Sequence, residues 1–246
     1  MAIVKTDVPQ TSELCNNTIL ELVKTYPFLR TELLTETAFG RKIRTLVIGK
    51  GKRKVIYSAA HHANEWITTP ILLKFAEELA ETIENGGEIF GIDAKMLAET
   101  VTIYLVPMVN PDGVDLVTGA IKPGEGQYET ARALAGYTEY INPDLILAYH
   151  AQGKEIYWQF DDIEVPGAEE LGRRLAEVSG YTLTAPAEVS SYAGYKDWFI
   201  KSFRKPGYTI EVGSGENPLP LEQFDEIYRA NLGILVTAAL GLPGGA

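Results

Sequence analysis

VIYSAAHHANEW, residues 55–66, joins a strand-like apolar run to a cluster of polar side chains. The cluster contains His61 and His62, two of the chain's 3 histidines, and Glu65. In open α/β sheets, ligands bind at the carboxyl ends of the strands. If residues 54–60 form a buried strand, this cluster therefore lies where such a sheet would hold a ligand.

Outward from this stretch, strand patterns alternate with helix patterns. This alternation predicts an α/β fold: one layered domain over residues 1–246, with a mixed, mostly parallel sheet flanked by helices. The turn Gly49-Lys-Gly51 favours a hairpin between the first two strands, with the basic residues 50–54 at a solvated tip. Strands are expected at 41–48, 54–60, 101–109, 145–150, 155–160 and 207–212, and helices at 11–24, 67–84, 127–140, 166–180 and 221–240.

Composition excludes several classes of protein. The net charge of -11 argues against a nucleic-acid partner, because nothing could neutralise a row of phosphates. The single Cys15 excludes an internal disulfide and a cysteine-based zinc site. The chain has no apolar run long enough for a membrane span, and no basic, apolar start typical of a secretory signal. We therefore expect a cytoplasmic protein with no membrane partner; its oligomeric state stays open.

Three predicted strand ends carry side chains that suit zinc chemistry. His62 and Glu65 follow one strand, His150 closes a second, and Glu211 ends a third. Catalytic zinc commonly has three protein ligands and one open position, and a further carboxylate can take a proton from water. The HxxE pair alone is weak evidence, since such a loop can simply be hydrogen-bonded. His150 and Glu211, both after apolar runs, favour the zinc interpretation.

The motifs HANEW, NPDG, AYHAQGKEIYW, YAGYKDWF and PGYTIEVGSGENPLP occur in the order expected of the zinc metallocarboxypeptidase family. Over about residues 35–240 the chain more closely resembles its bacterial branch of γ-D-glutamyl-diaminopimelate peptidases. The resemblance implies a zinc-carboxypeptidase-like fold with one zinc ion per chain, held by His62, Glu65 and His150. It makes Glu211 the general base. It places His61 either beside the metal group formed by these three ligands or at the surface.

The resemblance also suggests residues that contact the substrate. Tyr192 matches a mobile tyrosine that closes over substrate, although its spacing to Asp197-Trp198 is short. The alternative is that it is an ordinary loop aromatic. Gln152 follows the third ligand and is expected to face the substrate. NPDG, residues 110–113, is expected to form a turn in the cleft wall.

The arginine-bearing segment of the family is shortened in this chain. The family's Asn-Arg pair, which grips the substrate carboxylate, is missing, because the chain has no Asn-Arg dipeptide. Between Gly113 and His150 the only cationic residues are Lys122 and Arg132. Arg132 is therefore the first candidate for the missing substrate contact and Lys122 the second, although either could be a solvated surface charge.

Three functions follow from these observations. The first is a zinc metallopeptidase that hydrolyses small cell-wall peptides of the γ-D-glutamyl-diaminopimelate class. The second is a related zinc amidohydrolase or deacylase on the same fold. The third is a zinc-binding relative with little or no turnover. The shortened segment leaves all three open.

Overall fold

The computed structural model describes residues 2–122, 131–184 and 194–242. Eight strands in these segments form one sheet, and a two-stranded ribbon lies apart from it. The strands are β1 (Arg30–Glu36), β2 (Lys42–Ile48), β3 (Arg53–Ser58), β4 (Glu88–Ile89), β5 (Ile92–Asp93), β6 (Val101–Val106), β7 (Leu145–Ala151), β8 (Glu155–Tyr157), β9 (Thr182–Thr184) and β10 (Gly207–Val212). The α-helices are α1 (Ser12–Thr25), α2 (Thr68–Asn85), α3 (Ala94–Thr100), α4 (Pro111–Val117), α5 (Ala131–Ile141), α6 (Ala168–Ser179), α7 (Tyr195–Phe203) and α8 (Phe224–Leu240), with short 3₁₀ turns η1 (Ala63–Glu65) and η2 (Leu221–Gln223).

The large sheet has the order β1-β2-β6-β3-β7-β10-β8-β9. The four central strands β6, β3, β7 and β10 are parallel to one another. On either side of them, β2 runs antiparallel to β6, and β8 runs antiparallel to β10. The parallel core and the flanking helices confirm the predicted mixed, mostly parallel α/β fold. Because the four central strands point the same way, their carboxyl ends meet at one edge.

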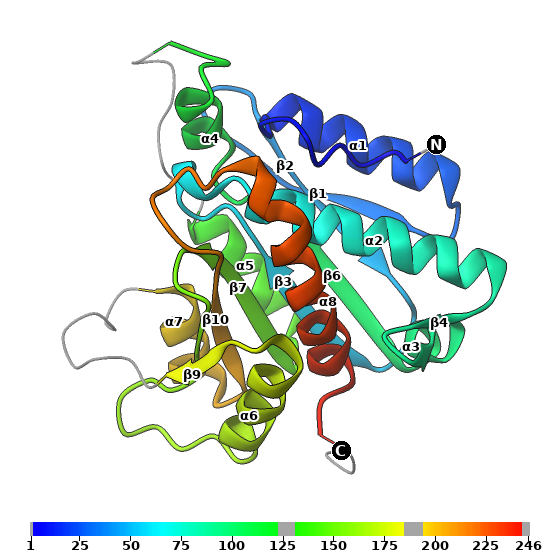
Figure 1. The fold of residues 1–246 in the computed structure, drawn as a ribbon, viewed down its shortest axis with the longest axis vertical. Helices are drawn as coiled ribbons and strands as arrows, with labels where there is room; N and C mark the ends of the chain where they lie inside the picture. Colours follow the sequence, from blue (N-terminus) through cyan, green and yellow to red (C-terminus); the bar gives the residue numbers. More distant parts are fainter. Residues whose placement is uncertain (1, 123–130, 185–193, 243–246) are drawn as a thin grey trace.

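Helices cover both faces of this sheet. Alternate residues of β7 point to opposite faces of the sheet. Leu147 and Tyr149 belong to a core that includes side chains of α1, α2, α6 and α8. Ile146 belongs to a second core, which includes side chains of α5 and α7. This alternation follows from the two-residue period of a strand. In Figure 1, α2 and α8 cross in front of the central strands. Among the described residues, no helix is long and apolar enough to cross a bilayer.

The predicted hairpin between residues 41–48 and 54–60 is wrong. β2 and β3 do not pair; β6 lies between them, antiparallel to β2 and parallel to β3. Their connection passes very close to the start of β6, where a Cβ on Gly49 would lie 2.2 Å from the Val101 carbonyl oxygen. The glycines therefore serve this close crossing rather than a tight turn.

Part of the basic cluster that follows is also less exposed than expected. Lys50 and Lys52 are exposed, but Arg53 and Lys54 are half-buried. Arg53 Nε donates to the Ala239 carbonyl at 2.8 Å, and Lys54 Nζ donates to the Ile141 carbonyl at 3.3 Å. These carbonyls belong to the last turns of α8 and α5, where a positive charge is favourable.

The NPDG motif begins a helix instead of forming a simple turn. Asn110 is the N-cap of α4, and its side-chain oxygen accepts from the Gly113 amide at 3.0 Å. Pro111 takes the first helical position, where its missing N–H costs nothing. On α4, Asp112 and Asp115 each lie 2.8 Å from the guanidinium of Arg41, which fastens this helix to the start of β2.

Candidate metal centre

Two segments, the turn after β3 and the end of β7, bring the three predicted metal ligands together. The chain leaves β3 and forms η1, which carries Glu65 just after His62. His150 lies near the end of β7, the parallel neighbour of β3. Side chains from segments far apart in the sequence thus meet at the carboxyl edge of the sheet, as the strand pattern predicts.

The distances within this group suit a metal ion. His62 Nδ1 lies 2.8 Å from Glu65 Oε1, and His150 Nδ1 lies 3.0 Å from Glu65 Oε2. The two Nδ1 atoms are 3.3 Å apart. Tetrahedral ligands about 2.0–2.1 Å from zinc are separated by about 3.3 Å, so the donor atoms have nearly the required spacing. His62, Glu65 and His150 could therefore hold one zinc ion.

Local hydrogen bonds hold the η1 turn in this shape. The Glu65 carbonyl accepts from Thr68 Oγ1 at 2.7 Å, and the same hydroxyl accepts from the Ala60 amide at 2.9 Å. Burial alone would raise the pKa of the Glu65 carboxyl, but its hydrogen bonds to His150 and His62 outweigh this and lower it. Glu65 is therefore held as a carboxylate, the form that binds a metal.

His61 lies beside the metal group, not within it. Its Nε2 atom is 2.9 Å from Ser58 Oγ, and its ring stacks on His150 with centroids 4.9 Å apart. Its ring also lies 5.8 Å from that of Tyr195 on α7. Burial holds the pKa of His61 well below its usual value, so the ring is neutral and packs against the ligand His150.

Glu211 is next to the metal group on the adjoining strand. It is paired in register with His150, and its side chain is half-buried. Burial raises the pKa of Glu211 to about 7, with a further increase from Glu65 that the neighbouring histidines oppose. A carboxyl group with a pKa near neutrality can both accept and release a proton, as a general base requires.

Comparisons with known proteins agree with this geometry. The zinc carboxypeptidase family profile matches residues 15–123. A γ-D-glutamyl-L-diamino acid endopeptidase of Lysinibacillus sphaericus is 35% identical over 277 residues, which cover 89% of this chain and 69% of that protein. The uncharacterised protein YqgT of Bacillus subtilis strain 168 is 31% identical, covering 88% of this chain and 73% of its own. The chain belongs to the zinc carboxypeptidase family.

Solved structures show the same fold at lower identity. Bovine thrombin-activatable fibrinolysis inhibitor, in complex with tick carboxypeptidase inhibitor, is 15% identical with a TM-score of 0.78, covering 96% of this chain and 97% of its own. Carboxypeptidase A of Helicoverpa armigera is 16% identical with a TM-score of 0.73, covering 96% of this chain and 75% of its own. The chain is thus a metallopeptidase with the carboxypeptidase fold.

The lengths of the alignments agree with the prediction that the arginine-bearing segment is short in this chain. The alignment with the L. sphaericus enzyme spans 277 residues, more than the 246 residues of the whole chain, so the relative has residues that this chain lacks. The family profile stops at residue 123, inside the segment that the sequence predicts to be short.

The predicted substrate contacts are less closely grouped than the metal ligands. Gln152 is exposed directly after β7, two residues beyond His150 in the chain. Arg132 is exposed in the first turn of α5, and Lys122 is exposed before the segment 123–130. Tyr192 lies outside the described residues. The substrate roles of these four residues stay predictions.

The sequence predicts no role for Glu155, and it predicts only that Asn217 helps to fix the loop after Glu211. Glu155 stands opposite Glu211 in the pairing of β8 with β10. Asn217, in the loop after β10, donates to the Ala151 carbonyl at 2.6 Å and ties that loop to the end of β7. Both contacts depend on which strands are neighbours, and no local sequence signal predicts that.

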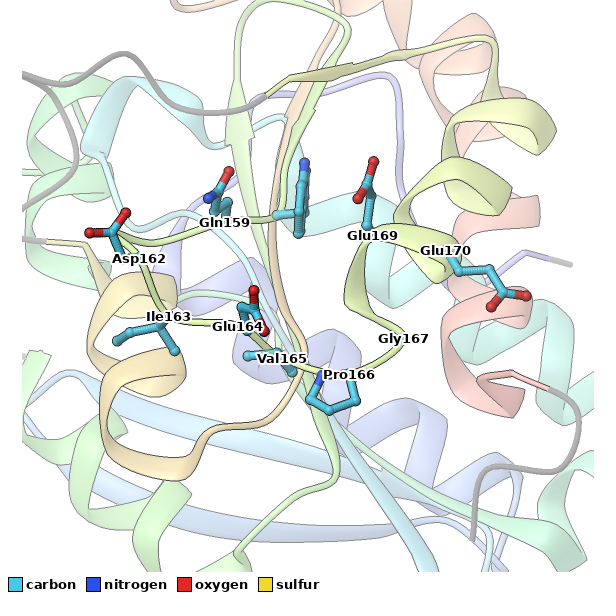
Figure 2. A pocket seen from close by; sticks show the side chains of 10 residues that line it. Gln159, Asp162, Ile163, Glu164, Val165, Pro166, Gly167, Glu169 and Glu170 are labelled. Carbon is cyan, nitrogen blue, oxygen red and sulfur yellow. The ribbon is translucent and has the colours of Figure 1, made fainter.

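A separate pocket of about 580 Å³ lies in the loop between β8 and α6. Its wall includes Trp158 and the acidic side chains Asp162, Glu164, Glu169 and Glu170, which Figure 2 shows around the hollow. None of the three metal-group residues lines it. β8 runs antiparallel to β10, so its end leads away from Glu211 and the carboxyl edge. This pocket is therefore separate from the candidate metal site that includes His62.

Proposed function

We propose that this chain is a zinc-dependent peptidase that hydrolyses the amide bond between a γ-D-glutamyl residue and a diamino acid in small cell-wall-type peptides. One observation carries the proposal: His62, Glu65 and His150 converge within hydrogen-bonding distance of one another, with Glu211 on the next strand. A metal group and a half-buried carboxylate, side by side, are the two parts that metal-assisted hydrolysis needs.

In this proposal His62, Glu65 and His150 hold one zinc ion per chain. The bound ion would supply a Lewis acid that activates a water molecule and polarises the scissile carbonyl. Glu211 takes the proton from that water and delivers it to the leaving amine. Burial raises the pKa of Glu211 in the metal-free chain, so this carboxylate is a stronger base than an exposed glutamate.

The substrate class is supported by the similarity to the L. sphaericus enzyme, whose name specifies a γ-D-glutamyl-L-diamino acid bond. The motifs around His150 and Glu211 resemble the same bacterial branch. A diamino acid also carries a second amino group, which suits a site rich in carboxylates in a chain of net charge -11.

Hydrolysis of defined compounds tests this function. The zinc-loaded protein is incubated with a γ-D-glutamyl-diaminopimelate peptide, its α-linked isomer and an N-acyl amino acid, and products are followed by mass spectrometry. We expect release of the diamino acid from the γ-linked peptide alone. Release of only the acyl group would indicate a deacylase, and bound zinc without any hydrolysis would indicate a family member without turnover.

A further inference from the structure

Glu155 lies in one row with the proposed catalytic groups. Strand pairing places it opposite Glu211, which is itself paired with His150. Residues directly opposite on neighbouring strands share a face of the sheet, so the three side chains point to the same side. A Cβ built on Gly153 would lie 3.4 Å from both Glu155 Oε2 and Glu211 Cβ, so these two atoms are at most twice that distance apart.

The Glu155 carboxylate is oriented by a hydrogen bond, and within the described part of the chain it forms no salt bridge. Tyr157, on the same face two residues along β8, donates its hydroxyl hydrogen bond to Glu155 Oε2. Across residues 2–122, 131–184 and 194–242, no salt bridge involves Glu155. A half-buried carboxylate in such a place can bind a positively charged group, which would offset its partly lost hydration.

Lys154, the residue before Glu155, and Lys196 of α7 are both paired with other groups. Lys154 precedes β8, and its Nζ lies 2.7 Å from Glu226 Oε1 of α8. Lys196 of α7 is buried, and its Nζ contacts Asp197 and donates to the Gln159 carbonyl at 2.6 Å. Neither lysine is paired with Glu155, so the positive charge that suits this carboxylate would come from a ligand.

We propose that Glu155 binds the side-chain ammonium group of the diamino acid and so determines specificity. This inference rests on the proposed function and names the residue that recognises the second amino group. An ammonium–carboxylate hydrogen bond is among the stronger polar contacts in proteins. A substrate without the amine leaves the Glu155 carboxylate desolvated and unpaired, which is how a polar site rejects an analogue that lacks its partner.

Two peptides that differ in one amino group test this inference. γ-D-Glutamyl-L-lysine and γ-D-glutamyl-L-norleucine have the same chain length, and only the first has the side-chain amine. We expect wild type to prefer the lysine peptide. Glu155→Gln should lower kcat/KM for the lysine peptide on the order of 10- to 100-fold, the range for a hydrogen bond to a charged group. The norleucine peptide should change less than about threefold, because it makes no such hydrogen bond.

Two further variants sharpen the result. Tyr157→Phe keeps the carboxylate but removes the hydroxyl that orients it, so it should weaken the lysine preference less than Glu155→Gln does. It also tests the inference if Glu155→Gln fails to fold. Glu164→Gln removes an exposed negative charge from the pocket of Figure 2 and should leave the preference unchanged.

Other outcomes would overturn the inference. Equal losses on both peptides in Glu155→Gln would mean that Glu155 positions Glu211 instead of binding the amine. A preference lost in Glu164→Gln but kept in Glu155→Gln would move the ammonium site to the pocket.

If wild type hydrolyses neither peptide, the proposed function fails but Glu155 can still be tested. Calorimetric binding of both peptides to zinc-loaded Glu211→Gln then decides. A lysine preference that disappears on adding Glu155→Gln supports the inference, and equal affinity for the two peptides overturns it.

Discussion

The two ends of the central parallel strands carry charged side chains for different purposes. At the amino end, Arg53 and Lys54 donate to carbonyls in the last turns of α8 and α5. At the carboxyl end, Glu65 and the two histidines contact one another, and the nearby Glu211 and Glu155 carboxylates stand in the adjoining strands. The amino-end charges are satisfied by the fold, whereas the carboxyl end gathers groups that a metal and a substrate can use. Substitutions at the two ends should therefore separate stability from function.

The largest effect is expected from His62→Ala at the carboxyl end. Loss of one of three metal ligands should remove bound zinc, and with it essentially all hydrolysis. Metal content after gel filtration, measured by atomic emission, checks this. His61→Ala is the matched control, because His61 stacks on His150 without belonging to the metal group, and it should retain most of the zinc. Equal metal loss in both variants would contradict the assignment.

Glu211→Gln should come next in size. The proposed general base does not hold the ion, so zinc content and melting temperature should stay near those of wild type. Turnover should fall on the order of 10²- to 10⁴-fold, the usual contribution of general acid–base catalysis. A variant that hydrolyses the peptide as fast as wild type would make Glu211 a structural residue only.

The shortened segment gives the third prediction. Without the family's arginines, we expect intact zinc binding with weak peptidase activity. If Arg132 replaces the missing donor, Arg132→Ala should reduce kcat further, on the order of 10²-fold. Lys122→Ala is the comparison for the second candidate. Full family-like rates that survive both substitutions would place the donor elsewhere in the chain.

The smallest effect on function is expected at the amino end. Arg53→Ala removes the hydrogen bond to the Ala239 carbonyl and a favourable charge at the end of α8. Such contacts contribute on the order of 1–2 kcal/mol, so the melting temperature should fall by a few degrees. The kcat/KM of the folded protein should not change. Lys52→Ala, at an exposed neighbour, should affect neither quantity, and a loss of activity in Arg53→Ala would break the division between the two ends.

Local patterns in the sequence account for much of the fold and the metal group. Strand and helix periodicities placed the four central strands and most of the long helices, because side-chain burial repeats every two or 3.6 residues. His62 and Glu65 are separated by one short turn, so their proximity follows from the chain itself. His150 and Glu211 stand out in the sequence because polar and charged side chains are uncommon in buried strands, and their roles stay predictions.

The order of the strands was decided only by tertiary packing. A glycine turn between two strands predicts a hairpin, yet β6 enters between β2 and β3 because the helix α3 returns the chain to that position. The same long-range choice places β8 beside β10 and so puts Glu155 opposite Glu211. It also turns the basic residues Arg53 and Lys54 toward the ends of distant helices. Such contacts join residues far apart in the chain, and their free energy depends on the whole packed core, which no local spacing encodes.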